Sequence, residues 1–149
     1  MSKPSVPSLP CMCASFRRAS RALTQFYDQA LRPLGLRGTQ FTILQALSLV
    51  GEVSQGELGK ILAIDSTTLT RTLEIMGRHG WISKQAGKDR REWRLRMTRA
   101  GESQFKRALP RWQEVQSRLR SQLGSDRWEQ LLSLTNIVTS AVTESGDLS

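Results

Sequence analysis

The sequence predicts a mainly α-helical protein with a small β-wing, on three features of residues 54–98. Two short amphipathic segments follow one another, and polar side chains occupy the first two turns of the second. Gly80 then ends the helical pattern, and the apolar period changes from 3.6 to 2 residues, which indicates a hairpin. The hairpin tip, residues 86–91, is rich in basic side chains. This combination is typical of a winged helix-turn-helix domain.

Apolar spacing and capping residues predict four helices before the hairpin. Apolar side chains recur three and four residues apart over residues 11–31 and again over 39–49, so each stretch should form one helix. Ser54 and Glu57 have the spacing of a capping box and begin a short third helix. Asp65 is a good N-cap for the fourth helix, which carries the polar face.

The hairpin and two further helices account for the rest of the chain. One strand starts at residues 81–83, and the other covers 93–97, where Trp, Leu and Met alternate with arginine. Thr98 can cap a long helix, which we expect Pro110 to kink or break because proline removes a backbone hydrogen bond. A turn at residues 124–126 separates this helix from the last one.

Length and composition place the chain among ordinary globular proteins. A length of 149 residues with 38% hydrophobic content fits one domain with a modest core. No apolar run reaches the ~18 residues that a membrane span requires, and the first ten residues lack the apolar centre of a signal peptide. We therefore expect a cytoplasmic protein with no membrane partner, in which the two cysteines are free thiols.

Positive charge is concentrated in the first two thirds of the chain. The net charge is +9 at pH 7, and residues 1–99 account for all of it. Such a distribution favours a polyanionic partner, with double-stranded DNA as the first candidate for a helix-turn-helix. Solubility would account for the charge equally simply, because many small domains carry a net charge of ~2–8.

The terminal helices predict a homodimer. Their apolar stripes have little else in the chain to cover them, and leaving them in water costs ~25 cal/mol per Å². A two-fold dimer would cover them and would present two helices to a pseudo-palindromic duplex ~34 Å apart. We expect a flexible arm over 1–10, one domain over 11–145 and a tail over 146–149. Within the domain, the expected parts are dimerisation helices at 11–33 and 100–145 and a DNA-binding part at 39–98.

Four motifs give the chain a family resemblance. They are Leu-Gly-Lys-Ile-Leu at 58–62, Asp-Ser-Thr-Thr-Leu-Thr-Arg at 65–71, Asp-Arg-Arg at 89–91 and Arg-Met-Thr-Arg-Ala-Gly at 96–101. In this order and spacing, the chain resembles the MarR family of bacterial transcription regulators over about residues 11–145. Methionine stands where the family's strand-to-helix junction usually has leucine, which is a volume-conserving replacement. The resemblance implies dimerisation through the terminal helices.

The resemblance also assigns the DNA contacts. Hydroxyl side chains at the start of the fourth helix would face the major groove, and Arg71 would form a bidentate contact with guanine, worth ~1–3 kcal/mol of discrimination. Arg91 would enter the minor groove, with Asp89 bracing it. Basic neighbours in the wing would bind phosphates. The full set is Ser66, Thr67, Thr68, Thr70 and Arg71 in the helix, and Lys88, Asp89, Arg90, Arg91 and Arg94 in the wing.

Two cysteines at the start of the first helix suggest a signal-sensing site. Helix N-termini carry positive potential, and Arg17 lies one turn beyond Cys13, so both favour a thiolate that oxidants or electrophiles attack. The segment at 13–21, Cys-Ala-Ser-Phe-Arg-Arg-Ala-Ser-Arg, resembles the reactive segment of the family's organic-hydroperoxide sensors. In that comparison Cys13 takes the reactive position, and Cys11 is a second thiol two residues away.

Tyr27 matches one of the positions where these sensors place a phenol to hold the thiolate. It lies fourteen residues from Cys13, or ~21 Å along one helix. In a straight helix it cannot reach Cys13 of its own chain, but it can reach the partner's Cys13 if the two first helices cross antiparallel. Arg17 and Gly38 stand at the other two phenol positions, so peroxide specificity does not follow from the resemblance.

The two cysteines also fit roles other than oxidant sensing. Cys11 and Cys13 can bind a soft metal or metalloid, and a dimer would supply four thiolates. They can also be inert small residues at a dimer seam. A small aromatic acid bound between the dimer and DNA-binding parts, as in other family members, needs no cysteine. The single histidine, His79, ends the fourth helix and is expected to be a packing residue or a charge at the helix terminus.

Enzyme classes fit the sequence poorly, and no cofactor is expected. The sequence has no nucleophile elbow, phosphate loop or zinc signature, and only one histidine can act as a base. We therefore predict a homodimeric DNA-binding regulator, a repressor that a thiol-reactive signal or a small ligand releases. The alternative from another class is an architectural winged helix that binds nucleic acid without sequence preference, so its affinity would not depend on a palindrome.

Overall fold

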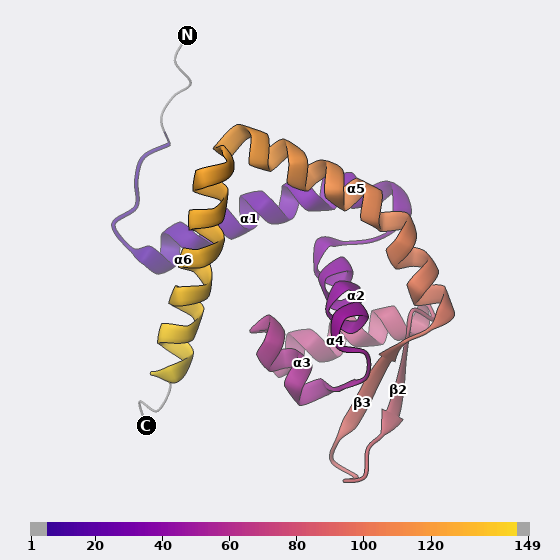
Figure 1. Ribbon diagram of the computed structural model, residues 1–149. Helices are drawn as coiled ribbons and strands as arrows, with labels where there is room; N and C mark the ends of the chain where they lie inside the picture. The colour runs from indigo at the N-terminus through magenta and orange to yellow at the C-terminus, as the bar shows by residue number, and fades with distance from the viewer. Residues whose placement is uncertain (1–5, 146–149) are drawn as a thin grey trace. The chain divides into compact units, whose positions relative to one another are not determined.

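The computed structural model describes residues 6–145, and the expected tail at 146–149 and residues 1–5 of the expected arm lie outside them. The described chain forms two compact units, one ending at Trp112 and one beginning at Gln113 (Figure 1). The elements are α1 (Met12–Leu31), a 3₁₀ turn (Arg32–Leu34), α2 (Gly38–Val50), β1 (Val53–Ser54), α3 (Gln55–Leu62), α4 (Ser66–Arg78), β2 (Ile82–Ala86), β3 (Trp93–Met97), α5 (Arg99–Leu123) and α6 (Ser125–Glu144).

The first unit has one apolar core built around α2. Six residues of α2 are buried, and side chains from α3, α4, the sheet and the first half of α5 pack against them. The ring of Phe41 lies 5.4 Å from that of Phe105 and 5.6 Å from that of Trp112, which joins α2 to α5. The fully buried large side chains are Leu31, Leu36, Phe41, Ile43, Leu44, Leu58, Leu69, Met76 and Leu95.

Local capping signals in the sequence are confirmed. The Ser54 hydroxyl accepts the N–H of Glu57 at 3.1 Å, and the Glu57 carboxylate accepts the N–H of Ser54 at 3.2 Å, so the predicted capping box begins α3. At the other end of this region, the Thr98 hydroxyl accepts the N–H of Gly101 at 3.1 Å and begins α5. Gly80 adopts φ = 73° directly after α4, the left-handed conformation that only glycine takes without strain.

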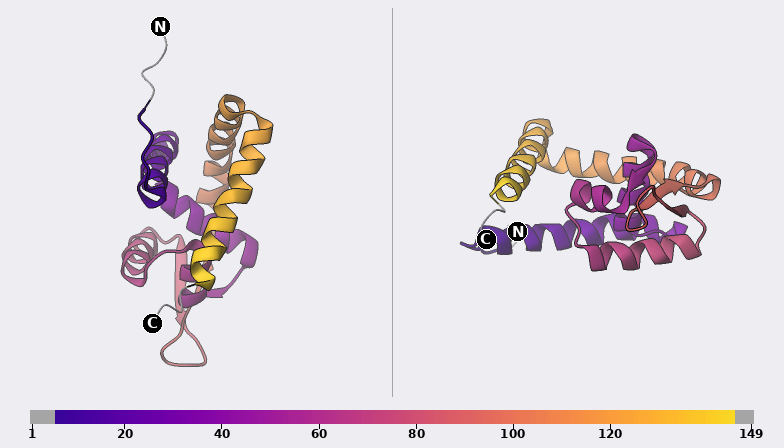
Figure 2. Two further views of the ribbon diagram at one scale, coloured as in Figure 1. Left: turned by 90° about the vertical axis from the view of Figure 1, so that its left-hand side faces the viewer. Right: turned by 90° about the horizontal axis from the view of Figure 1, so that it is seen from below.

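The sheet has three antiparallel strands in the order β1-β3-β2, one more than the sequence predicts. Ile82 pairs with Met97 and Ala86 with Trp93, so β2 and β3 form the predicted hairpin. The hairpin projects beyond the helices of its unit (Figure 1 and the left view of Figure 2). The additional strand β1 is only two residues long and pairs Val53 with Leu95. It escapes prediction because its partner is distant in sequence and its second residue also caps α3.

Of the kink or break expected at Pro110, the break is wrong, and the kink stays a prediction. Helix α5 runs without interruption from Arg99 to Leu123, with the proline inside it. Proline removes its own N–H from the helical ladder and crowds the carbonyl of residue i−4, so the surrounding packing must offset this cost. Buried Ala108 and half-buried Trp112, on either side of Pro110, belong to the packing of the first unit and hold both neighbouring turns helical.

The second unit consists of the end of α5 and the whole of α6, joined at Gly124. Gly124 has φ = 86°, which allows the chain to turn sharply between the two helices. An ion pair of 3.5 Å between Arg120 and Glu129 joins the helices near this turn. None of the helices within residues 6–145 is long and apolar enough to span a membrane.

Candidate nucleic-acid interface

Helix α4 presents a polar face at its N-terminus because its apolar residues point into the core. Leu69, Leu73 and Met76 are all buried on one side. A carboxylate oxygen of Asp65 accepts the N–H of Thr68 at 3.0 Å, which confirms Asp65 as the N-cap. Hydrogen bonds from the side chain and then the backbone N–H of Thr68 lower the pKa of Asp65, so the cap is charged at neutral pH. The side chains left exposed on the first two turns are Ser66, Thr67, Thr68 and Arg71.

Thr70 differs from the other predicted contacts of α4. Its side chain is half-buried, and its hydroxyl accepts a hydrogen bond of 3.0 Å from the side-chain amide of Gln55 on α3. The hydroxyl is therefore engaged within the helix-turn-helix, where it joins the two helices. The sequence did not suggest this bond because the two residues lie fifteen positions apart.

The hairpin tip is held by its own backbone and exposes its basic side chains. Gly87 donates its N–H to the carbonyl of Glu92 at 2.8 Å, and Glu92 donates to the carbonyl of Asp89 at 2.9 Å. The Asp89 carboxylate accepts the backbone N–H of Arg91 at 3.1 Å. Asp89 thus braces the main chain of Arg91 and not its guanidinium group. The exposed side chains of the tip are Lys88, Asp89, Arg90 and Arg91.

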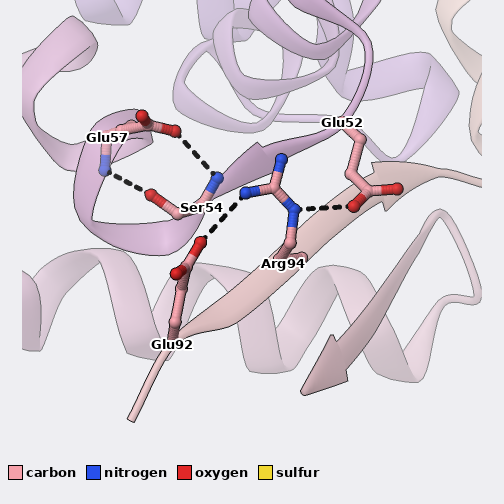
Figure 3. Close-up of polar contacts among 5 residues, drawn as sticks. All are labelled: Glu52, Ser54, Glu57, Glu92 and Arg94. Atoms are coloured by element: carbon pink, nitrogen blue, oxygen red, sulfur yellow. Dashed lines mark hydrogen bonds and ion pairs between the residues drawn. The ribbon is translucent and has the colours of Figure 1, made fainter. Parts of the chain in front are cut away.

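Arg94 lies on β3, opposite Ser54 of β1 and Gln85 of β2, and forms two ion pairs within the chain (Figure 3). Its guanidinium group donates to Glu52 at 2.6 Å and to Glu92 at 2.9 Å. The hydrogen bonds to Glu52 and then to Glu92 raise the pKa of Arg94 above its ordinary value. Two neighbouring carboxylates offset its charge, so Arg94 offers less to a phosphate than the arginines of the tip.

A hollow of about 880 Å³ lies between the helix-turn-helix and the wing. The start of α4 lines it with Asp65 and Ser66, and the wing lines it with Arg91 and Trp93. Lys60 of α3 lines it as well. The exposed ring of Trp93 lies 4.7 Å from the Lys84 ammonium group, a cation–π contact. Sequence reasoning missed Lys60 and Trp93, although the basic and aromatic residue types are the signal that could have found them.

The predicted sensing residues lie along α1. Cys11 is the N-cap and Cys13 belongs to the first turn, and both are exposed. Tyr27 lies on the same unbroken helix, more than three turns from Cys13, so the structure does not bring the phenol to the thiol within one chain. Burial raises the pKa of Tyr27. The described residues contain no cluster of three or more histidine, cysteine or carboxylate ligands for a metal.

His79 packs at the end of α4. Its ring stacks on that of Trp81 with a centroid distance of 4.4 Å and an interplanar angle of 11°. This position, directly after the last turn of the helix, agrees with the expectation of a packing residue.

A helix-turn-helix followed by a three-stranded sheet with a projecting hairpin is the architecture of a winged-helix DNA-binding domain. The MarR-family sequence model matches residues 36–93, which cover α2, the helix-turn-helix and most of the wing. The chain belongs to the MarR family.

Solved structures extend the likeness beyond the matched segment. The Mycobacterium tuberculosis transcriptional regulator MosR, crystallised in complex with DNA, is 37% identical, with a TM-score of 0.83, over 93% of this chain and 99% of that one. A cysteine mutant of E. coli MarR complexed with operator DNA is 22% identical, with a TM-score of 0.76, over 85% of this chain and 92% of that one, and shows the shared fold.

A curated relative gives a shorter match. The uncharacterised helix-turn-helix transcriptional regulator YwoH of Bacillus subtilis is 27% identical over 88 residues, which are 59% of this chain. The match spans 64% of YwoH, slightly less than two thirds of its length.

Proposed function

We propose that this protein is a homodimeric repressor that binds a pseudo-palindromic DNA operator and is released by a thiol-reactive signal or a small ligand. The observation that carries the proposal is the exposed polar and arginine-bearing face of α4 beside an exposed basic hairpin in the same unit. MosR, a similar protein along almost its whole length, was crystallised with DNA.

The residues divide into positioning contacts and base contacts. The hydroxyl groups of Ser66, Thr67 and Thr68 contact base edges in the major groove with little preference for one base. Arg71 adds a specific contact with guanine. Arg91 enters the adjacent minor groove, on a main chain that Asp89 braces. The exposed cations Lys88 and Arg90 bind phosphates, as Arg94 does more weakly because of its carboxylate partners. Thr70 supports this surface from behind through Gln55.

Exposed apolar side chains on the terminal helices support the dimer. In α1 they are Met12, Phe16 and Leu23; in α6 they are Leu131, Leu132, Leu134, Ile137 and Val142. A second copy that covered these side chains would remove them from water, which supplies the driving force for association. The family's dimerisation through its terminal helices agrees with this proposal.

The exposure of Cys11 and Cys13 at the start of α1 supports a thiol-based signal. An oxidant or electrophile reaches both sulfur atoms without unfolding the helix, and modification there would alter the dimer helix directly. Tyr27 of the partner subunit would approach Cys13 only in an antiparallel crossing of the two α1 helices. Soft-metal or metalloid binding by the same thiols is the second candidate, and across a dimer it would use four of them.

The experiment is a gel shift on the DNA upstream of the protein's own gene. It is repeated with a hydroperoxide, a quinone, a thiol-reactive metal ion and salicylate. We expect a saturable complex with two subunits per site, released by at least one of these agents. Equal affinity for random and palindromic duplexes would instead favour the architectural winged helix.

A cysteine variant separates the candidate signals. Cys13→Ser should leave DNA binding intact and abolish release by peroxide or quinone, because a hydroxyl does not form the thiolate nucleophile. Ser15→Ala, two residues from Cys13 and one turn from Cys11, is the control and should retain release. If peroxide or quinone still releases the Cys13→Ser variant from DNA, the thiol switch is refuted. If salicylate alone releases the wild-type protein, the signal is a small acid.

A further inference from the structure

One apolar side chain of α4 does not face the core. Of the four large apolar residues in this helix, Leu69 is 1% exposed, Leu73 4% and Met76 0%, whereas Ile75 is 43% exposed. With 43% of its surface in water, Ile75 contributes less to folding than its three buried neighbours, and the exposed part gains nothing from the core. The exposed side chain is therefore available to a partner.

The position of Ile75 continues the predicted DNA-contacting face. Thr68, Arg71 and Ile75 are spaced i, i+3 and i+7, so they form one stripe on the side of α4 opposite the buried residues. With a rise of about 1.5 Å per residue, Ile75 lies about 6 Å beyond Arg71 along the helix axis. Base pairs are about 3.4 Å apart, so this offset corresponds to a step of about two base pairs.

We propose that Ile75 is a specificity-determining residue that reads the 5-methyl group of a thymine in the major groove, one or two base pairs from the base that Arg71 contacts. The thymine methyl is the one apolar group that base edges present in that groove, and apolar side chains recognise it by contact. In this stripe the Thr68 hydroxyl contacts any base, Arg71 recognises guanine and Ile75 recognises the thymine methyl group. The inference depends on the proposed binding of α4 in the major groove.

The test measures methyl dependence directly. A preferred duplex is first selected from a random pool with the wild-type protein, and each thymine in it is then replaced by deoxyuridine, which lacks only the methyl group. Fluorescence anisotropy gives the affinity for each duplex. We expect one thymine per half-site whose replacement weakens wild-type binding about fourfold, as for one buried methyl group. Ile75→Ala should bind the thymine and deoxyuridine duplexes equally at that position.

Two further variants exclude indirect effects. Ile75→Val keeps a methyl contact and should retain part of the thymine preference. Ile61→Ala removes a similarly exposed apolar side chain, 54% exposed on α3, and should leave the thymine profile unchanged. Thermal unfolding of each variant checks that the fold is intact, as expected for surface positions.

The outcomes separate the inference from the proposed function. If the wild-type protein selects no sequence, base reading by α4 fails altogether. If it selects a sequence but no thymine position depends on its methyl group, or Ile75→Ala keeps that dependence, the role of Ile75 is refuted. Lost repression by Ile75→Ala with an unchanged methyl profile would assign the residue to a protein contact and overturn the proposal.

Discussion

Replacing Gly101 by alanine tests the junction that fixes the wing to α5. A Cβ atom at Gly101 would lie 2.0 Å from the carbonyl oxygen of Trp81 and 2.8 Å from Cγ of Met97. The same Trp81 oxygen accepts the N–H of Thr98 at 3.0 Å. The backbone must therefore move, and this hydrogen bond between the two ends of the hairpin would be lost.

The expected change in the free energy of unfolding is the sum of three contributions, two destabilising and one stabilising. A contact this short against main chain belongs at the upper end of overpacking costs, about 3 kcal/mol. The lost hydrogen bond adds about 1 kcal/mol, and the helix propensity of alanine returns about 1 kcal/mol. Gly101→Ala should therefore lower the free energy of unfolding by about 3 kcal/mol.

The matched control is the same substitution in α4. A Cβ atom at Gly77 meets nothing within 4 Å, so Gly77→Ala should raise stability by about 0.5–1 kcal/mol. Urea unfolding followed by circular dichroism measures both variants, at one protein concentration because a dimer's stability depends on it. A midpoint for Gly101→Ala equal to or above that of the wild type would refute the close packing of this junction.

Three further predictions concern charge. Because the folded-state pKa of Asp65 is lowered, its contribution to stability is complete above the ordinary carboxyl pKa of about 4 and is lost as pH falls through the lowered value. Urea midpoints between pH 5 and 2 should therefore decline less steeply for Asp65→Asn, and identical slopes would contradict this. Glu52→Gln should leave stability nearly unchanged because this ion pair is exposed, yet removing one of the two carboxylate partners of Arg94 should tighten DNA binding and steepen its salt dependence. Unchanged salt dependence would show that Arg94 stays away from DNA. Arg71→Ala should lose affinity at one base position in duplex selection, whereas equal loss on all sequences would refute base reading.

Short-range signals made most of the fold predictable. The capping box at Ser54 and Glu57, the N-cap Asp65 and the stop at Gly80 each act within four residues, and all are confirmed. The helix-turn-helix and hairpin follow from them, because the change of apolar period between α4 and β2 is also local.

Long-range contacts were not predictable from residue types. Strand β1 exists because Val53 meets Leu95, and the spacing of apolar residues carries no signal for a two-residue strand. Glu52 and Arg94 are 42 positions apart, so the sequence suggested a phosphate-binding cation and not the ion pair with Glu52. The break expected at Pro110 is wrong for the same reason: packing around Trp112 keeps α5 helical, and local propensity alone does not reveal packing.

The most direct test of the account measures whether the wing contacts DNA in a two-fold symmetric complex. Hydroxyl-radical footprinting on the selected duplex should show two minor-groove regions, related by two-fold symmetry, that the wild-type protein protects. Arg91→Ala should lose both and bind at least tenfold more weakly, whereas Arg111→Ala, the same charge change at an exposed position of α5, should keep them. Wild-type affinity and an unchanged footprint for Arg91→Ala would contradict DNA binding by α4 and the wing together.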